Sequence, residues 1–227
     1  MTPYYADAHV TIYHGDCLEI LPTLEPVDLI LTDPPYGIGE ANGKNKGRSK
    51  PFGSRKDAKN TRGKEIAARD YGVSQWDASP IDWPLMQDVI TKGKYACIFG
   101  GNYYPVPPSS AWLVWDKENS GYFADCELAW TNYGSAVRIK RHMWNGMLRK
   151  GNEKRFHPTQ KPLDVMLWCI ELCPGDPKTI LDPFAGSCTT SVAAKSLGRK
   201  CICIEREEKY CEIGAKRMRQ EYFDFSA

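Results

Sequence analysis

The chain has 227 residues, a hydrophobic fraction of 42%, a charged fraction of 26% and a formal net charge of +2. This length suits one domain of ordinary size, residues 1–227, and leaves little for a second module. The small net charge does not by itself indicate a nucleic-acid partner. No apolar run approaches the ~20 residues that cross a bilayer, and the N-terminus carries no targeting signal. We therefore expect a soluble, cytoplasmic protein without a membrane partner.

The nine cysteines do not form a metal-binding pattern. A Cys-x-x-Cys pair, the usual mark of a zinc site, does not occur. Most cysteines lie in or beside apolar runs or one helical turn apart, namely Cys17, Cys97, Cys169, Cys173, Cys201 and Cys203. We expect buried thiols in a reducing cytosol and no metal.

The apolar runs are short, rich in β-branched and aromatic residues, and bounded by turn residues. Several are continuous rather than alternating, which is typical of strands covered on both faces. In chain order we predict strands at Val10–Tyr13 and Val27–Leu31, a helix at Asp82–Thr91, strands at Tyr95–Phe99, Trp112–Trp115 and Cys126–Thr131, a helix at Pro162–Leu172, a strand at Thr179–Leu181, a helix at Thr189–Leu197, a strand at Lys200–Ile204 and a helix at Glu207–Tyr222. This interleaving predicts a three-layer α/β domain with a mostly parallel sheet.

Two basic stretches interrupt this pattern. Residues 38–75 form a long segment with few apolar residues, in which basic residues outnumber acidic ones. A segment of this length without an element is either functional or disordered. The second stretch, residues 136–156, contains seven basic residues, together with His142 and Trp144, and the single acidic residue Glu153.

The apolar strand Val27–Leu31 ends in the turn Asp33-Pro34-Pro35-Tyr36. Ligands of open α/β sheets bind beyond the carboxyl ends of strands, so this turn lies where chemistry would occur. Consecutive prolines remove two backbone donors and leave carbonyl acceptors. A carboxylate, an acceptor carbonyl and an aromatic ring together suit a planar ligand that carries an amino group. A polar turn that merely ends a strand is the alternative.

A second strand-and-turn unit lies near the C-terminal end, where residues 182–190 read Asp-Pro-Phe-Ala-Gly-Ser-Cys-Thr-Thr. A glycine lets a ligand approach the backbone closely, and the free N–H groups of the helix that follows favour a carboxylate. About twenty residues further on, the strand Lys200–Ile204 leads to Glu205. An acidic residue in this position typically holds ribose hydroxyls.

These segments resemble the DNA amino-methyltransferases. The catalytic motif of that family is Asp/Asn/Ser-Pro-Pro-Tyr/Phe, and its cofactor motif is Asp-Pro-Phe-x-Gly-Ser-Gly-Thr-Thr. Cys188 replaces the second glycine of the cofactor motif. Residues 157–162, His-Pro-Thr-Gln-Lys-Pro, and the pair Gly15-Asp16 match two further motifs. The catalytic turn precedes the cofactor loop, which is the order of the circularly permuted β group.

The resemblance implies a Rossmann-like class I methyltransferase fold that depends on S-adenosyl-L-methionine. Its sheet would have seven strands, one of them antiparallel, with the chain opening at the third strand and closing after the second. The implied catalytic residues are Asp33, Pro34, Pro35 and Tyr36. The implied cofactor-binding residues are Asp16, Cys17, Asp33, Thr159, Lys161, Asp182, Pro183, Phe184, Ala185, Gly186, Ser187, Thr189, Glu205 and Arg206.

In this family the exocyclic amine of the target base donates hydrogen bonds to the first side chain of the motif and to the carbonyl of its first proline. These acceptors correspond to Asp33 and the Pro34 carbonyl, and Tyr36 would stack on the extruded base. The amine lone pair is delocalised into the base, so it becomes nucleophilic only when acceptors draw it out of that plane. Extrusion costs roughly a few kcal/mol, of which stacking returns ~1–3 kcal/mol.

Double-stranded DNA is the expected partner, and a homodimer is compatible with the small target-recognition region at residues 136–156. We expect the basic stretches to contact phosphates. The predicted DNA-binding residues are Lys44, Lys46, Arg48, Arg138, Lys140, Arg141 and Arg149.

Four activities remain open at this stage. N6 of adenine is the leading target, because Asp at position 33 leans toward adenine, and N4 of cytosine shares the mechanism. Methylation of RNA or of a protein glutamine usually requires Asn at this position. The alternative from a different functional class is a catalytically inactive DNA- or nucleotide-binding protein. Cys188 is the only residue that suggests it.

Overall fold

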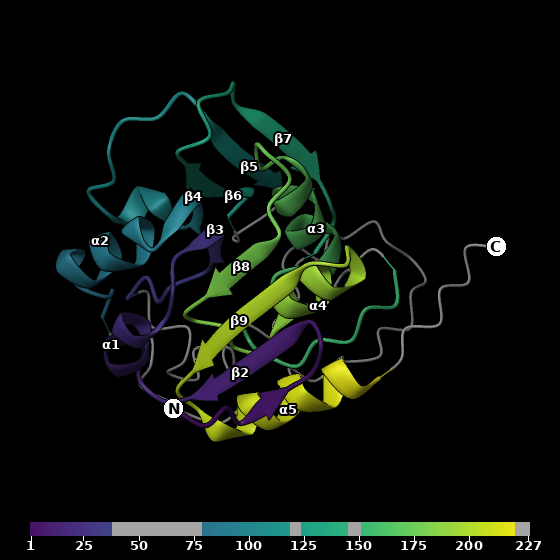
Figure 1. Cartoon of the computed structure of the whole chain (residues 1–227). Coiled ribbons are helices and arrows are strands. Elements are labelled where there is room, and N and C mark those ends of the chain that lie inside the picture. The colour runs from purple at the N-terminus through teal and green to yellow at the C-terminus, as the bar shows by residue number, and fades with distance from the viewer. Residues whose placement is uncertain (38–78, 119–123, 145–150, 221–227) are drawn as a thin grey trace, which may run out of the picture.

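The computed structural model describes residues 1–37, 79–118, 124–144 and 151–220. Within these ranges the fold is a three-layer α/β domain, as predicted (Figure 1). The strands are β1 (Tyr5–Ala6), β2 (Val10–His14), β3 (Val27–Thr32), β4 (Gly93–Phe99), β5 (Trp112–Asp116), β6 (Cys126–Thr131), β7 (Arg138–Arg141), β8 (Thr179–Asp182) and β9 (Lys200–Glu205). The helices are α1 (Cys17–Ile20), α2 (Trp83–Thr91), α3 (Leu163–Glu171), α4 (Thr189–Ser196) and α5 (Glu208–Arg219), with 3-10 turns at Leu21–Thr23 and Gly101–Tyr103.

The strands of the described residues form one sheet in the order β1-β2-β9-β8-β3-β4-β6-β5-β7. The five strands from β2 to β4 in this order are mutually parallel, and β6 runs antiparallel to both of its neighbours. The first of these in the chain, β2, lies beside the last, β9, so the circular permutation expected from the motif order is present.

The prediction of seven strands was too low, because the sheet of the described residues has nine. The two additional strands are short and lie at its edges. β1 has two residues and pairs antiparallel with β2, and β7 pairs parallel with β5. Neither has a buried apolar pattern, which explains why the sequence did not indicate them. The four-residue helix α1 and the 3-10 turns are also too short to produce a helical period.

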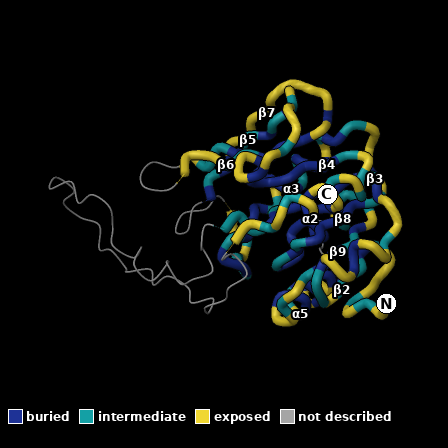
Figure 2. Tube along the Cα trace, turned by 90° about the vertical axis from the view of Figure 1, so that its left-hand side faces the viewer, coloured by how far each residue is buried: buried dark blue, intermediate teal, exposed yellow. Residues whose placement is uncertain are grey.

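The sheet is covered on both faces, and its central strands are therefore apolar on both sides (Figure 2). Along β3, Leu29 and Leu31 pack on the face that carries α3, α4 and α5, whereas Ile30 packs on the face of α1 and α2. Helix α2 begins at the cap residue Asp82, whose carboxylate accepts a hydrogen bond from the Leu85 amide at 3.2 Å. Two separate cores result, and the strands between them are rigidly held.

Parallel pairing brings the carboxyl ends of β2, β9, β8 and β3 to one edge of the sheet. The register pairs His14 with Glu205 and Asp182 with Cys203. From β8 the chain continues through α4 to β9, and from β3 it continues through α2 to β4 on the opposite side. Strand order therefore reverses between β8 and β3, which is where open α/β sheets form ligand crevices.

All nine cysteines are free thiols, and every one except Cys126 is buried. Among the described residues, no helix combines the length and the apolar character that a bilayer span requires.

Candidate active site

A cavity of about 420 Å³ opens at the point where the strand order reverses. Its volume is within the usual range for small-molecule sites. All fourteen residues predicted to bind the cofactor line it: Asp16, Cys17, Asp33, Thr159, Lys161, Asp182, Pro183, Phe184, Ala185, Gly186, Ser187, Thr189, Glu205 and Arg206. Further lining residues were not predicted, among them Leu18, Ile81, Leu85, Gln160, Met166, Ile204 and Tyr210. The apolar members looked like ordinary core residues in the sequence, and only the tertiary fold turns them toward the cavity.

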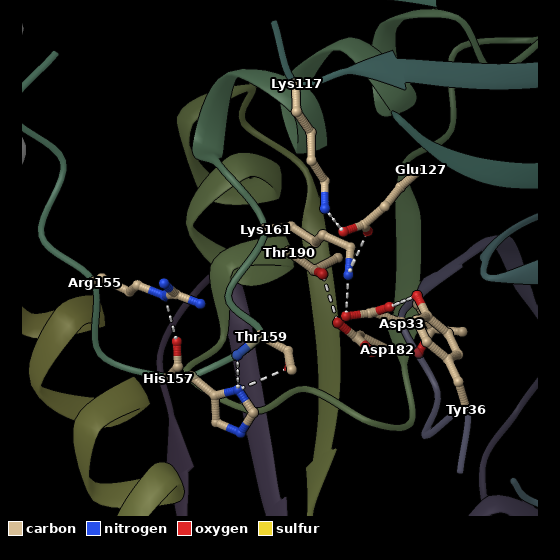
Figure 3. A network of polar contacts seen from close by, with 11 residues as sticks. Asp33, Tyr36, Lys117, Glu127, Arg155, His157, Thr159, Lys161, Asp182 and Thr190 are labelled. Atoms are coloured by element: carbon tan, nitrogen blue, oxygen red, sulfur yellow. Dashed lines mark hydrogen bonds and ion pairs between the residues drawn. The ribbon is translucent and has the colours of Figure 1, made fainter. Parts of the chain in front are cut away.

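Asp33 lies at the wall of this cavity, directly after β3. Its carboxylate accepts hydrogen bonds from the hydroxyl of Tyr36 and from the ammonium group of Lys161 (Figure 3). The carbonyl of Pro35 accepts a hydrogen bond from the Tyr104 hydroxyl. Among the described residues, the Pro34 carbonyl accepts none. The Pro34 carbonyl is thus the one available to a donor, and it is also the carbonyl that the family resemblance implies as acceptor of the target amine.

The ring of Tyr36 is held by close backbone contact and by stacking. Gly100 has a φ of 66°, and a Cβ atom there would lie 2.0 Å from the Tyr36 ring, so only glycine fits. Tyr103 stacks on Tyr36 with 5.0 Å between ring centroids and 15° between planes. Tyr103 is 51% exposed and was not predicted as a site residue. The turn Asp33–Tyr36 therefore presents an aromatic pair beside Asp33.

A chain of alternating charges extends from Asp33 through Lys161 and Glu127 to Lys117 (Figure 3). The side chain of Lys161 is 6% exposed, contacts Asp33 and lies 3.1 Å from Glu127, which in turn pairs with Lys117 at 2.5 Å. Burial opposes the charge on each group, yet Lys161 and Lys117 lower the pKa of Glu127 to about 2. Asp33 and Glu127 likewise raise the pKa of Lys161 against the effect of burial. Burial raises the pKa of Asp33, although Lys161 counteracts it.

Glu127 was assigned no catalytic role from the sequence, because ordinary core and surface was at least an equal interpretation of the segment 116–130. The antiparallel hairpin of β5 and β6 places it opposite Trp115, two residues from Lys117. Nothing in the local sequence indicates this placement, since the partner Lys161 follows 34 residues later in the chain.

Hydrogen bonds at the end of β8 fix the glycine loop. Asp182 is buried and accepts hydrogen bonds from Thr32 at 2.6 Å, from the Phe184 amide at 3.2 Å and from Thr190. Burial raises the pKa of Asp182 to about 7. These bonds join β8 to β3 and to the first turn of α4, so Asp182 holds the glycine loop in place.

Glu205 connects the glycine loop to the end of β9. Its carboxylate accepts a hydrogen bond from the Gly186 amide at 2.7 Å and another from the Glu207 amide at 2.7 Å. Burial raises the pKa of Glu205 to about 7 against these two bonds. Each carboxylate oxygen keeps lone-pair capacity for a further donor. Glu205 is therefore placed to accept hydroxyl donors inside the cavity.

His157 packs beneath the glycine loop. Its ring lies 3.6 Å from the position that a Cβ atom on Gly186 would take and 4.3 Å, between centroids, from the ring of Tyr210. The Thr159 amide donates a hydrogen bond to its Nδ1 at 3.3 Å. Burial lowers the pKa of His157 to about 3, so the ring is neutral. The neutral ring of His157 therefore packs as a support for the glycine loop.

Cys188 occupies the position where the family motif has its second glycine. Gly214 in α5 leaves room for its side chain. Its backbone is left-handed, with a φ of 60°, and its side chain is fully buried. A Cβ atom on Gly214 in α5 would lie 2.4 Å from the Cys188 sulfur. The thiol thus occupies the space that a side chain at position 214 would need.

This complementarity leads to a stability prediction. Gly214→Ala should destabilise the protein by about 1–3 kcal/mol because the new methyl group overpacks against the thiol. In a Cys188→Gly background the same change should be neutral or stabilising, since alanine favours helix over glycine by about 1 kcal/mol. Denaturant unfolding of both single variants and the double variant measures this coupling. Equal costs of Gly214→Ala in the two backgrounds would contradict it.

The predicted DNA-binding residues are only partly described. Arg138, Lys140 and Arg141 lie on the edge strand β7, where Arg138 and Arg141 are exposed and Arg141 pairs with Asp116 at 3.4 Å. Because β7 is parallel to β5, Arg141 is at the same edge of the sheet as the cavity. Lys44, Lys46, Arg48 and Arg149 lie outside the described residues, as do the whole of the basic loop 38–75 and part of region 136–156.

The permuted sheet and its cofactor-sized cavity define a Rossmann-like methyltransferase fold. Two solved structures share it: the M1.HpyAVI–SAM complex (TM-score 0.54, 23% identity, covering 92% of this chain and 99% of that chain) and the cytosine-N4-specific PvuII DNA methyltransferase (TM-score 0.58, 17% identity, covering 99% and 90%). Sequence similarity points to a more particular class. Residues 106–216 match the N6_N4_Mtase family, described as DNA methylase. The DNA adenine methyltransferase YhdJ of Escherichia coli strain K12 is 28% identical over 249 residues, covering 92% of this chain and 82% of YhdJ. These matches confirm the resemblance: the chain is similar to DNA methyltransferases of the N6/N4 class.

Proposed function

We propose that this protein transfers a methyl group from S-adenosyl-L-methionine to N6 of adenine in DNA, by direct attack of the extruded base amine. One observation carries the proposal: the Asp33 carboxylate lies at the junction of the cofactor cavity and the Tyr36–Tyr103 aromatic pair. A base stacked beside Tyr36 could present its amine to Asp33 while facing the cavity.

The fourteen cavity-lining residues predicted for the cofactor fit S-adenosyl-L-methionine in their chemistry. Glu205 would accept the ribose hydroxyls, Asp16 would accept the adenine amine, and the glycine loop with Thr159 would face the methionine end. Asp16 is also the cap of α1, accepting a hydrogen bond from the Leu18 amide at 3.0 Å. The bound cofactor supplies an electrophilic sulfonium methyl group.

The chain's own residues prepare the nucleophile. Hydrogen bonds from the target amine to Asp33 and to the Pro34 carbonyl localise the nitrogen lone pair and aim it at the cavity. With the cofactor bound, the amine nitrogen would take the methyl group as that group leaves the sulfur, and the nitrogen would then release one proton. Asp33 is the nearest base for that proton, and its raised pKa suits the role.

Adenine is preferred over cytosine because an aspartate, rather than a serine, occupies position 33, and because the relative YhdJ is named as an adenine methyltransferase. The fold likeness to the cytosine-N4-specific PvuII enzyme keeps N4 of cytosine as the second candidate. Both amines have the same delocalised lone pair, so one geometry serves either reaction.

The deciding experiment identifies the methylated nucleoside. The protein is incubated with methyl-labelled S-adenosyl-L-methionine and unmethylated genomic DNA, and the DNA is digested to nucleosides. We expect label in N6-methyladenine. Label in N4-methylcytosine would transfer the proposal to the second candidate, and no label in DNA under conditions where the cofactor binds would support an inactive binding protein.

A further inference from the structure

We propose that Glu127 is a positioning residue that receives the Lys161 ammonium group when the target amine takes the place of that group on Asp33. This inference rests on the proposed function, because it assigns Asp33 as the acceptor of the amine. In the free protein the Lys161 ammonium group would be bound to the catalytic acceptor Asp33. Glu127 would be the second carboxylate to which this group can move.

The geometry provides both positions. The Lys161 ammonium group bonds to Asp33 Oδ2 and lies 3.1 Å from Glu127 Oε2, between the two carboxylates (Figure 3). Glu127 Oε2 is buried, and among the described residues it accepts no well-aligned hydrogen bond. A small movement of the lysine head would complete the bond to Glu127 and release Asp33.

Both oxygens of Asp33 already have donors, so the amine must share the carboxylate with Lys161 unless the lysine moves. Tyr36 donates to Oδ1 and Lys161 donates to Oδ2. An ammonium ion is a stronger donor than an aromatic amine, so it competes with the substrate for the same carboxylate. The side chain of Lys161 is only 6% exposed, and its charge cannot be left unpaired in this setting without a large cost.

Charge balance lets Glu127 perform this role. Glu127 stays ionised across the neutral range, because Lys161 and Lys117 hold its pKa at about 2 against burial. Lys117 pairs with the other oxygen, Oε1, and leaves Oε2 for Lys161. The lysine therefore exchanges one carboxylate for another, and the net charge of the cluster does not change.

Glu127 could instead be a purely structural residue that ties β6 to the segment before α3. The two roles differ in what happens when Lys161 is also removed. If Lys161 competes with the amine, a neutral glutamine at position 127 leaves it bound to Asp33, and removing it should then restore turnover. If Glu127 only supports the fold, removing its partner brings no recovery.

The test compares Glu127→Gln with Glu127→Gln/Lys161→Gln, using labelled cofactor and unmethylated DNA. The single variant should lose about 10- to 100-fold in kcat, with the dissociation constant for S-adenosyl-L-methionine within about twofold of wild type. The double variant should regain about fivefold or more over the single one. Asp7→Asn is the matched control, because Asp7 pairs with Lys195 at 2.6 Å outside the cavity and its loss should leave kcat unchanged.

The outcomes separate the two proposals. An inactive Asp33→Ala variant together with a fully active Glu127→Gln variant would overturn this inference and leave the proposed function intact. A double variant slower than, or equal to, Glu127→Gln would assign Glu127 a structural role and overturn it as well. An active Asp33→Ala variant would refute the proposed function itself.

Discussion

Replacing Asp33 by alanine is expected to reduce methyl transfer by about 10³-fold while S-adenosyl-L-methionine binding remains measurable. The change removes the charged acceptor for the amine, and losing one such preorganised partner typically costs about 10²–10³ in turnover. The cofactor should still bind, because Asp182 and Glu205 on neighbouring strands keep the glycine loop in place. Single-turnover transfer of labelled methyl to DNA measures the rate, and calorimetry measures cofactor binding.

Tyr36→Phe is the matched control for this prediction. It keeps the ring that stacks on Tyr103 but removes the hydroxyl that donates to Asp33. We expect a loss of about 10- to 100-fold, smaller than that of Asp33→Ala, since a hydrogen bond to a charged group contributes about 1.5–3 kcal/mol. Wild-type turnover in Asp33→Ala would refute the catalytic assignment, and a Tyr36→Phe defect equal to that of Asp33→Ala would shift the main role to the hydroxyl.

Replacing Glu205 by alanine is expected to weaken S-adenosyl-L-methionine binding by about 10- to 100-fold, because hydrogen bonds to a charged group contribute about 1.5–3 kcal/mol. The loss includes the support that Glu205 gives to the Gly186 amide at 2.7 Å. Glu208→Ala is the control: this residue is exposed on the first turn of α5 and does not line the cavity. Calorimetry that shows unchanged affinity in Glu205→Ala would refute the ribose role.

The same residue should make cofactor binding pH-dependent. Burial raises the pKa of Glu205 to about 7, so the carboxyl group is partly protonated at neutral pH. Ribose hydroxyls donate to the ionised form, and binding therefore requires loss of the proton. Affinity should be full above pH 7 and should fall as the pH drops below it, by at most tenfold per pH unit. Glu205→Gln should abolish this dependence, and titrations at pH 6 and pH 8 test it.

Much of the fold could be predicted from the sequence alone. All seven predicted strands and all four predicted helices are present, because long apolar runs and helical periods are local properties of the chain. The helix predicted at Glu207–Tyr222 corresponds to α5, Glu208–Arg219, with residues 221 and 222 outside the described range. The permuted order followed from motif order, which is also a property of the linear sequence.

The motif residues were predictable for a similar reason. Asp16, Asp33, Asp182 and Glu205 each follow or end a strand of a parallel run, and parallel pairing brings such ends to one edge. Their shared place around one cavity is thus a consequence of strand direction. Their chemical roles remain predictions.

Only the tertiary structure decided how the turn Asp33–Tyr36 is held in place. The segment Asp33–Tyr36 can be recognised in the sequence. The residues that hold it come from elsewhere: Glu127 from β6, Tyr103 from the turn after β4 and Lys161 from the segment before α3. Pairing between groups so far apart depends on strand register and burial, neither of which leaves a local pattern. The same holds for Cys188, whose fit depends on Gly214 in another helix. The sequence by itself determined the class of fold and the chemistry at the strand ends; packing determined which charges meet there.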